Sequence, residues 1–248
     1  MSGEQKRVVI TGLGAVTDLG VGAEALWHGL CEGRSGIGTI TAFEQGDEWF
    51  TTIAGEASDF DPTDFMSVPD VRKADRACQL GMAAAVEAAK DSGMDFESGD
   101  PYRRGVAIGS GIGGILTIES QYARLLDKGP RRLSPFVVPK LMVNATAGQV
   151  SIRLDLRGPN TAVATACATG GHAIADACMM IQRGMSDVML AGGCEAAVSS
   201  LCIAAFGAMK ALSTQNDAPT EASRPFDRDR DGFVLAEGAA VVVLESLE

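Results

Sequence analysis

The sequence of 248 residues has few aromatic side chains, few histidines and no long apolar run. Phenylalanine, tryptophan and tyrosine together make up 5% of it, and histidine occurs twice, at His28 and His172. No segment approaches the roughly 18 apolar residues of a membrane-spanning helix, and residues 1–7 lack the apolar region of a signal peptide. These absences argue against a membrane or secreted protein, and we expect a cytoplasmic location.

Metal-binding cysteine pairs and excess positive charge are also absent. The six cysteines include no Cys-x-x-Cys pair, which argues against a zinc or thioredoxin-type site, and their spread suits a reducing compartment. The formal net charge is −11, which disfavours binding to nucleic acid or to an anionic membrane surface. We therefore expect no metal, no cofactor, no nucleic-acid partner and no membrane partner.

Apolar residues and glycine are abundant and favour a layered α/β protein. Hydrophobic residues make up 46% of the sequence, and its 30 glycines often separate apolar runs. Strands and helices are expected to alternate around a mostly parallel sheet in one domain, residues 1–248. The expected strands are 8–11, 105–108, 160–166, 188–191 and 239–244, and the expected helices are 22–30, 71–91, 115–127, 143–154 and 168–184.

Cys167 is the most informative residue. It lies in Thr165-Ala166-Cys167-Ala168-Thr169-Gly170-Gly171, between an expected strand and an expected helix. A cysteine at such a turn lies near free backbone N–H groups and the positive end of a helix dipole, which both favour the thiolate. This is a suitable place for the nucleophile of a covalent catalyst, although a cysteine is often simply a small buried apolar residue.

Two glycine-rich stretches resemble a dinucleotide-binding fingerprint. Gly109-Ser110-Gly111-Ile112-Gly113-Gly114 has the G-x-G-x-x-G spacing between a strand and a helix, and Gly12-Leu13-Gly14 also follows a strand. The longer stretch is not in the first βαβ unit and has no acidic residue ending a strand about 20 residues later. We therefore favour tight turns and close backbone packing over nucleotide binding.

Two further features could suggest chemistry that the sequence does not support. Residues 227–232, Asp-Arg-Asp-Arg-Asp-Gly, imitate the start of a calcium-binding EF-hand loop, but position twelve is Gly238 instead of glutamate. His172 follows Cys167 by five residues, so on a helix the two side chains point in different directions. Neither a calcium site nor a Cys–His pair is expected.

Several motifs in register resemble the β-ketoacyl-acyl carrier protein synthases of the thiolase superfamily. The similarity covers essentially the whole chain and is closest to the chain-elongating enzymes of type II fatty acid synthesis. It is carried by Thr165-Ala166-Cys167, the glycine run 109–114, Ser134-Pro135-Phe136, Gly158-Pro159, Ala211-Leu212-Ser213, Arg224-Pro225-Phe226-Asp227 and Asp231-Gly232-Phe233-Val234.

The resemblance implies a fold and a reaction. The fold would be a thiolase-like layered α/β/α structure, here the first βαβαβαββ half with a five-stranded mixed, mostly parallel sheet. Cys167 would take an acyl group from acyl carrier protein as a thioester. Malonyl carrier protein would then lose CO₂, and its carbanion would attack this thioester to give a 3-oxoacyl chain two carbons longer. The resemblance also implies a homodimer.

Other roles are implied residue by residue. Gly111, Ile112 and Phe206 match positions along the acyl tunnel, and Val137 matches one that reaches into the neighbouring subunit's tunnel. Basic positions that dock the acidic carrier protein are matched by Arg72, Lys73, Arg131, Arg132 and Lys210.

One departure and three alternatives accompany the resemblance. The family continues into a second half that brings two catalytic histidines, a lysine and a gating phenylalanine, so this chain is expected to be an N-terminal half that cannot condense alone. It is also expected to fold poorly alone. The alternatives are a polyketide ketosynthase, a thiolase-type or starter-unit synthase, and a non-catalytic partner subunit. Partner subunits usually lack the nucleophile, so Cys167 argues against the last.

Overall fold

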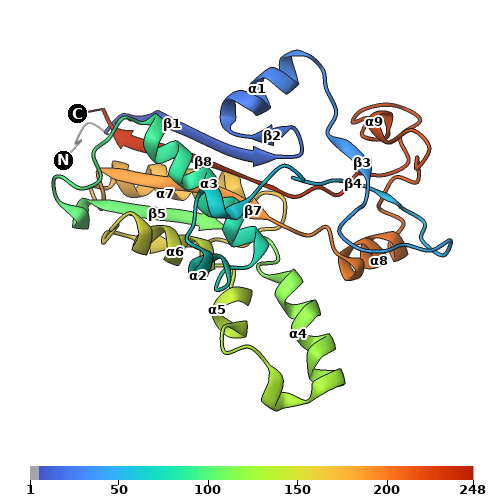
Figure 1. Cartoon of the computed structure of the whole chain (residues 1–248). Coiled ribbons are helices and arrows are strands. Elements are labelled where there is room, and N and C mark those ends of the chain that lie inside the picture. The colour runs from blue at the N-terminus through green and yellow to red at the C-terminus, as the bar shows by residue number, and fades with distance from the viewer. Residues whose placement is uncertain (1–5, 248) are drawn as a thin grey trace.

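The computed structural model describes residues 6–247 as a central sheet with helices on both faces and a projecting helical arm (Figure 1). The strands are β1 (Val8–Thr17), β2 (Gly20–Val21), β3 (Ile37–Thr39), β4 (Ile53–Gly55), β5 (Arg104–Gly109), β6 (Asn160–Thr161), β7 (Val188–Glu195) and β8 (Gly238–Ser246). The helices are α1 (Ala23–Cys31), α2 (Val68–Val71), α3 (Arg76–Asp91), α4 (Ile115–Lys128), α5 (Val137–Leu141), α6 (Ala145–Arg153), α7 (Thr169–Gln182), α8 (Ser200–Ala208) and α9 (Pro219–Ala222).

The main sheet has six strands in the order β2-β1-β8-β7-β5-β6, which confirms the mixed α/β class. The expected count of five strands is wrong, because the chain reverses after Thr17 and adds the two-residue strand β2 beside β1. The expectation of mostly parallel pairing is also wrong. Strands β5–β7 and β5–β6 pair in parallel, but β8 lies between β1 and β7 and is antiparallel to both. A separate antiparallel pair, β3–β4, forms between the expected helices 22–30 and 71–91, where no strand was expected.

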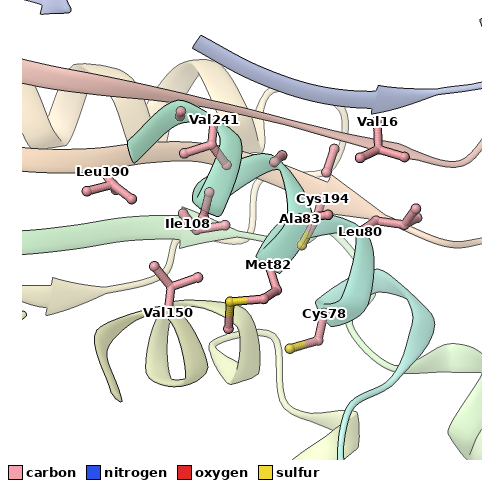
Figure 2. Close-up of a cluster of buried hydrophobic side chains, with 14 of the residues drawn as sticks. Val16, Cys78, Leu80, Met82, Ala83, Ile108, Val150, Leu190, Cys194 and Val241 are labelled. Carbon is pink, nitrogen blue, oxygen red and sulfur yellow. The ribbon is translucent and has the colours of Figure 1, made fainter. Parts of the chain in front are cut away.

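Helices α3 and α7 pack on opposite faces of the sheet. Along β7, Leu190 belongs to the buried cluster that includes α3, whereas Met189 belongs to the cluster that includes α7. This alternation is the period of two expected for a strand that is buried on both sides. Figure 2 shows the α3 cluster, whose members include Leu80 and Ala83 of α3, Val241 of β8 and Val150 of α6.

Glycines inside β1 explain why this strand is longer than predicted. The sequence suggested that the strand ends at Gly12, but β1 continues to Thr17. A side chain at Gly12 would put its Cβ 2.1 Å from Ala88 O, and one at Gly14 would put it 2.0 Å from Ala84 O. Both oxygens belong to the backbone of α3, so these glycines allow a helix to lie directly on the strand.

The start of α3 is set by Asp75. The periodic pattern predicted one helix over 71–91, but the structure separates the short helix α2 from α3. The buried Asp75 carboxylate caps α3 by accepting from Ala77 N and also accepts from Thr117 N on α4. This residue therefore fixes the beginning of the arm against the core.

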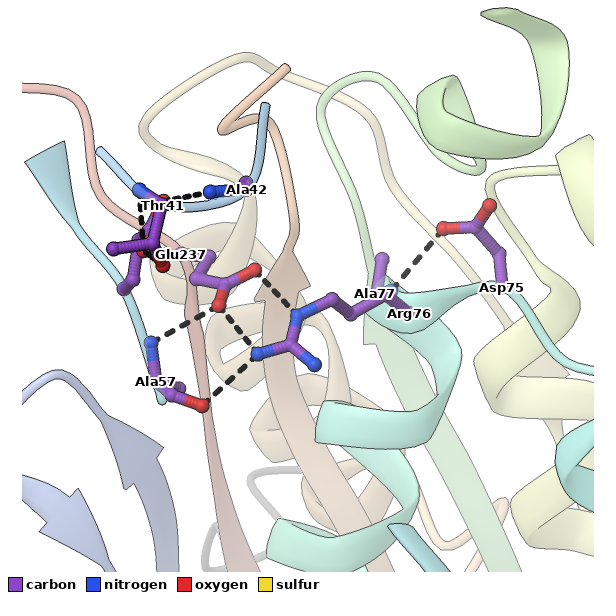
Figure 3. Close-up of polar contacts among 8 residues, drawn as sticks. Thr41, Ala42, Ala57, Asp75, Arg76, Ala77 and Glu237 are labelled. Carbon is purple, nitrogen blue, oxygen red and sulfur yellow. Dashed lines mark hydrogen bonds and ion pairs between the residues drawn. The ribbon is translucent and has the colours of Figure 1, made fainter. Parts of the chain in front are cut away.

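A buried ion pair connects the start of α3 to the residue that precedes β8 (Figure 3). Arg76 Nε donates to one Glu237 carboxylate oxygen at 2.7 Å, and Nη2 donates to the other at 2.6 Å. The same guanidinium donates to Ala57 O, and Ala57 N donates to Glu237. The pair thus joins three distant segments, and its two-point geometry suits arginine.

Helices α4 and α5 form an arm that projects from the body of the molecule (Figure 1). The short helical turn Pro130–Arg132 lies between them. Several large apolar side chains on this arm are exposed, among them Tyr122, Leu126 and Val138. Among residues 6–247, no helix is both long enough and apolar enough to cross a bilayer.

Candidate active site

A tight turn between β6 and α7 presents Cys167. Ala166 has a φ of 52°, in the left-handed region that residues other than glycine seldom adopt. The Thr169 hydroxyl donates to Ala166 O at 2.7 Å and accepts from Thr165 N at 2.9 Å. These bonds hold the unfavourable backbone conformation in place directly before Cys167.

The turn takes up residues that were predicted to be a strand. The sequence suggested a strand over 160–166, but β6 contains only Asn160 and Thr161. The chain then leaves the sheet, and residues 162–168 form the approach to α7. Because the chain leaves the sheet before this point, Cys167 is exposed.

The six cysteines divide clearly by environment. Cys78 and Cys194 are buried, and burial raises the pKa of these thiols to about 11 and about 12. Cys31 and Cys167 are exposed, but they lie at opposite kinds of helix end. Cys31 is the last residue of α1, where the helix dipole disfavours negative charge, whereas Cys167 lies just before α7, where the dipole favours it. Cys167 is therefore the cysteine best placed to act as a nucleophile.

Cys167 opens onto a mostly apolar pocket of about 780 Å³. The predicted tunnel residues Gly111, Ile112 and Phe206 line the same pocket. The Phe206 ring meets Phe233 edge-on with 5.3 Å between ring centroids, which closes part of the wall. The structure thus brings together an exposed cysteine and an apolar space suited to an alkyl chain.

Glu195 holds the loop that carries two of these pocket residues. At the end of β7, its carboxylate accepts from Ser110 Oγ at 2.9 Å, Gly111 N at 2.8 Å and Ile112 N at 3.1 Å. Burial raises the pKa of Glu195, and these hydrogen bonds oppose that shift. The carboxylate thus occupies two amides of the G-x-G-x-x-G stretch, those of Gly111 and Ile112.

Glu195 was missed by the sequence reasoning. It comes directly after the buried run that ends at Cys194, and a charged residue at the end of a buried strand was the available signal. Its partners are 83 to 85 residues away, so no local motif reveals the contact.

The remaining predicted tunnel residue lies elsewhere. Val137 begins α5 on the arm and does not line the pocket with Cys167. Its expected role concerns a neighbouring subunit and stays a prediction.

The five predicted docking residues are all exposed but lie on three separate segments. Arg72 and Lys73 follow α2, and Lys73 lies 3.5 Å from Asp70. Arg131 and Arg132 lie at the tip of the arm, and Lys210 follows α8 (Figure 1). Among the described residues, no hydrogen bond or ion pair joins these three segments at the five residues, so the docking role stays a prediction.

The histidines and the aspartate-rich loop have other partners. His172 Nδ1 lies 2.7 Å from Thr165 Oγ1, and His28 lies 3.5 Å from Glu24. In the aspartate-rich loop, Arg224 pairs with Asp227 at 3.1 Å. Within residues 6–247, no group of three or more histidine, cysteine or acidic side chains could hold a metal ion.

The sequence of this chain is similar to a family of known proteins along nearly its whole length. The sequence model of the family described as "Beta-ketoacyl synthase, N-terminal domain" matches residues 5–248. The chain is 50% identical over 244 residues to the 3-oxoacyl-[acyl-carrier-protein] synthase 2 of Vibrio harveyi, covering 98% of this chain and 59% of that protein.

Solved structures show the same fold. A β-ketoacyl synthase from Burkholderia phymatum STM815 superposes with a TM-score of 0.87 at 35% identity, covering 97% of this chain and 59% of that one. A type II PKS acyl-carrier protein in complex with its ketosynthase, bound to the hexaketide, gives a TM-score of 0.85 at 29% identity over 98% of this chain and 59% of that one. The chain therefore spans about three-fifths of the length of these relatives.

Proposed function

Because the chain belongs to the β-ketoacyl synthase family, we propose that it carries the acyl-loading residue of a 3-oxoacyl-acyl carrier protein synthase. The resemblance predicted from the sequence motifs is confirmed at the level of the family. The proposal rests mainly on one observation: Cys167 stands exposed at a braced turn before α7 and opens onto an apolar pocket.

In the proposed loading step, Cys167 Sγ attacks the thioester carbonyl of an acyl carrier protein. The new carbon–sulfur bond forms, and the carrier's thiolate leaves and takes up a proton. The backbone N–H of Cys167 stabilises the developing oxyanion, helped by the N-terminal end of α7. The apolar pocket then shelters the acyl chain from water.

Condensation needs more than this chain's residues. In the proposed second step, malonyl carrier protein loses CO₂, and the resulting carbanion attacks the acyl-Cys167 carbonyl to elongate a fatty acid by two carbons. The resemblance assigns polarisation of the malonyl thioester to two histidines in a second half. We propose that residues 1–248 form the N-terminal ketosynthase domain and load acyl groups without condensing them.

The proposed partners are acyl carrier protein, in its acyl and malonyl forms, and a second copy of the same chain. Exposed arginines and lysines on a chain of net charge −11 support docking of an acidic protein by local attraction. Exposed apolar side chains on the arm, such as Leu126, support a homodimer. A cytoplasmic location remains a prediction.

The alternatives are weaker. The 3-oxoacyl-[acyl-carrier-protein] synthase 2 from Vibrio harveyi is 50% identical, whereas the type II PKS ketosynthase is 29% identical, which supports fatty acid elongation over a polyketide pathway. A non-catalytic partner subunit has no need of an exposed cysteine at a helix N-terminus. Fatty acid elongation is therefore the function we propose.

Covalent loading tests the proposal. The purified chain is incubated with acyl carrier protein carrying a decanoyl thioester, and the adduct is located by intact mass and peptide mapping. We expect one acyl group on Cys167, lost in Cys167→Ser and retained in Cys31→Ser, which removes the other exposed cysteine. Acylation spread equally over Cys31 and Cys167, or absent from both, would overturn the proposal.

A further inference from the structure

The segment Ser110–Gly113 is held from one side by a single carboxylate. Glu195 accepts from the hydroxyl of Ser110 and from the successive amides of Gly111 and Ile112. The Ser110 hydroxyl in turn accepts from Gly113 N at 2.7 Å. The backbone amides of 111–113 are thus satisfied by Glu195 and by a hydroxyl that Glu195 holds.

This segment also lies directly against the nucleophile turn. A Cβ built on Gly111 would be 2.9 Å from Glu195 Oε2 on one side and 3.4 Å from Ala166 Cα on the other. Gly111 therefore lies close to both the carboxylate and the residue before Cys167, and a side chain at this position would crowd them. A shift of the segment away from Glu195 changes both the Cys167 turn and the wall formed by Ile112.

Glu195 itself faces the pocket. It lines the same cavity as Cys167, beside Cys194 and Ala197, and is only partly buried. A buried structural ion pair in this fold, such as Arg76–Glu237, neutralises its charge with a guanidinium. Among residues 6–247, the donors to Glu195 are the neutral groups of Ser110, Gly111 and Ile112, all from the pocket wall.

We propose that Glu195 is a positioning residue that fixes the Ser110–Gly113 wall and thereby admits long acyl groups to Cys167. The inference rests on the proposed acyl-loading function. A short acyl group can react with Cys167 at the nucleophile turn without entering the pocket deeply. A long acyl chain must also pass along the pocket wall that includes Ile112. In Glu195→Gln, the negative charge is lost and only one acceptor oxygen remains, so the hydrogen bonds that hold the wall weaken, the wall moves and long groups lose their path.

Reaction of Cys167 with short and long reagents measures this role. Iodoacetamide and N-decyl iodoacetamide alkylate the sulfur without acyl transfer, and acetyl- and decanoyl-pantetheine test loading itself. In Glu195→Gln we expect the rates with the decyl and decanoyl reagents to fall at least about tenfold, while rates with the short reagents stay within about twofold. Ser110→Ala, which removes one of the bonds, should shift the long-to-short ratio in the same direction by a smaller factor.

Glu56→Gln is the matched control. The Glu56 carboxylate also accepts from one hydroxyl and two successive amides, those of Thr41 and Ala42, but it does not line the Cys167 pocket (Figure 3 shows Thr41 and Ala42). In Glu56→Gln, the ratio of the rate with the long reagents to the rate with the short reagents should match that of the wild type. Equal losses for short and long reagents in Glu195→Gln, or no loss, would overturn the positioning role. If the wild type takes neither thioester, the loading function fails, and the two iodoacetamides still decide the role of Glu195.

Discussion

Helices α3 and α7 cover opposite faces of one sheet, but they are buried to very different extents. Ten residues of the 16-residue helix α3 are buried, most of them alanines, whereas four residues of the 14-residue helix α7 are buried. Met179 on α7 and Met185 just after it are exposed. The more exposed helix carries Cys167 at its N-terminus, so the α3 face mainly supplies stability and the α7 face presents the chemistry.

The closest packing on the α3 face gives the largest expected effect. Gly14→Ala would place a Cβ 2.0 Å from Ala84 O, so α3 would have to move away from β1. We expect a loss of about 3 kcal/mol in the free energy of unfolding, measured by urea denaturation. Gly38→Ala in β3, where the new Cβ meets no atom within 4 Å, is the strand control and should stay within about 0.5 kcal/mol. Equal effects at both sites would show that α3 does not depend on this contact.

The buried ion pair at the start of α3 comes next. Glu237→Gln removes the negative charge opposite Arg76, and the side chain of Glu237 is only 5% exposed. We expect a loss of about 2 kcal/mol in the free energy of unfolding, because the half-buried guanidinium keeps its charge without its partner. The double variant Arg76→Met/Glu237→Gln should recover part of the loss, since no unpaired charge remains. If Glu237→Gln were as stable as the wild type, the Arg76–Glu237 pair would not stabilise the start of α3.

The site was predictable from the sequence where its signals were local. The turn with Cys167 stands out because a strand-like run meets a helix-like run there, and the glycine run 109–114 was recognised as a tight turn. The length of β1 was missed because the need for Gly12 and Gly14 arises from α3, which is distant in sequence. The antiparallel position of β8 and the hydrogen bonds of Glu195 were missed for the same reason: both are set by pairing between distant segments.

One glycine in α3 and one in α7 test the difference in packing between these two helices. A Cβ at Gly81 of α3 would lie 2.6 Å from Thr146 Cγ2 and 3.0 Å from Cys194 Sγ, whereas a Cβ at Gly171 of α7 would meet nothing within 4 Å. Gly81→Ala should therefore destabilise the fold by about 1 kcal/mol, because crowding outweighs the gain in helix propensity. Gly171→Ala should stabilise it by about 0.5 kcal/mol. Thermal unfolding of both variants measures the difference, and a stabilised Gly81→Ala would mean that the α3 face has spare room.

The smallest expected effect concerns the ion pair that ties the end of α7 to the sheet. Arg103 donates to both oxygens of Asp187, at 2.9 and 2.7 Å, and to Gly184 O just after α7. The hydrogen bonds from Arg103 lower the pKa of Asp187. A carboxyl with a lowered folded-state pKa contributes its full stability above its unfolded pKa of about 3.9 and loses it as the pH falls through the lower folded value.

The pH dependence of the stability of Asp187→Asn therefore tests whether this ion pair stabilises the α7 face. The two side chains are 37% and 44% exposed. We expect the variant to lose only about 0.5 kcal/mol at neutral pH, because solvent screens the pair. Urea unfolding at successive pH values should show the wild type and the variant converging in stability as the pH falls from about 3.9 through the lower folded-state pKa, below which Asp187 is protonated in both states. If the difference in free energy of unfolding between the wild type and Asp187→Asn stayed constant with pH, the charge of Asp187 would not stabilise the end of α7. The Arg103–Asp187 pair would then act through its shape and through neutral hydrogen bonds.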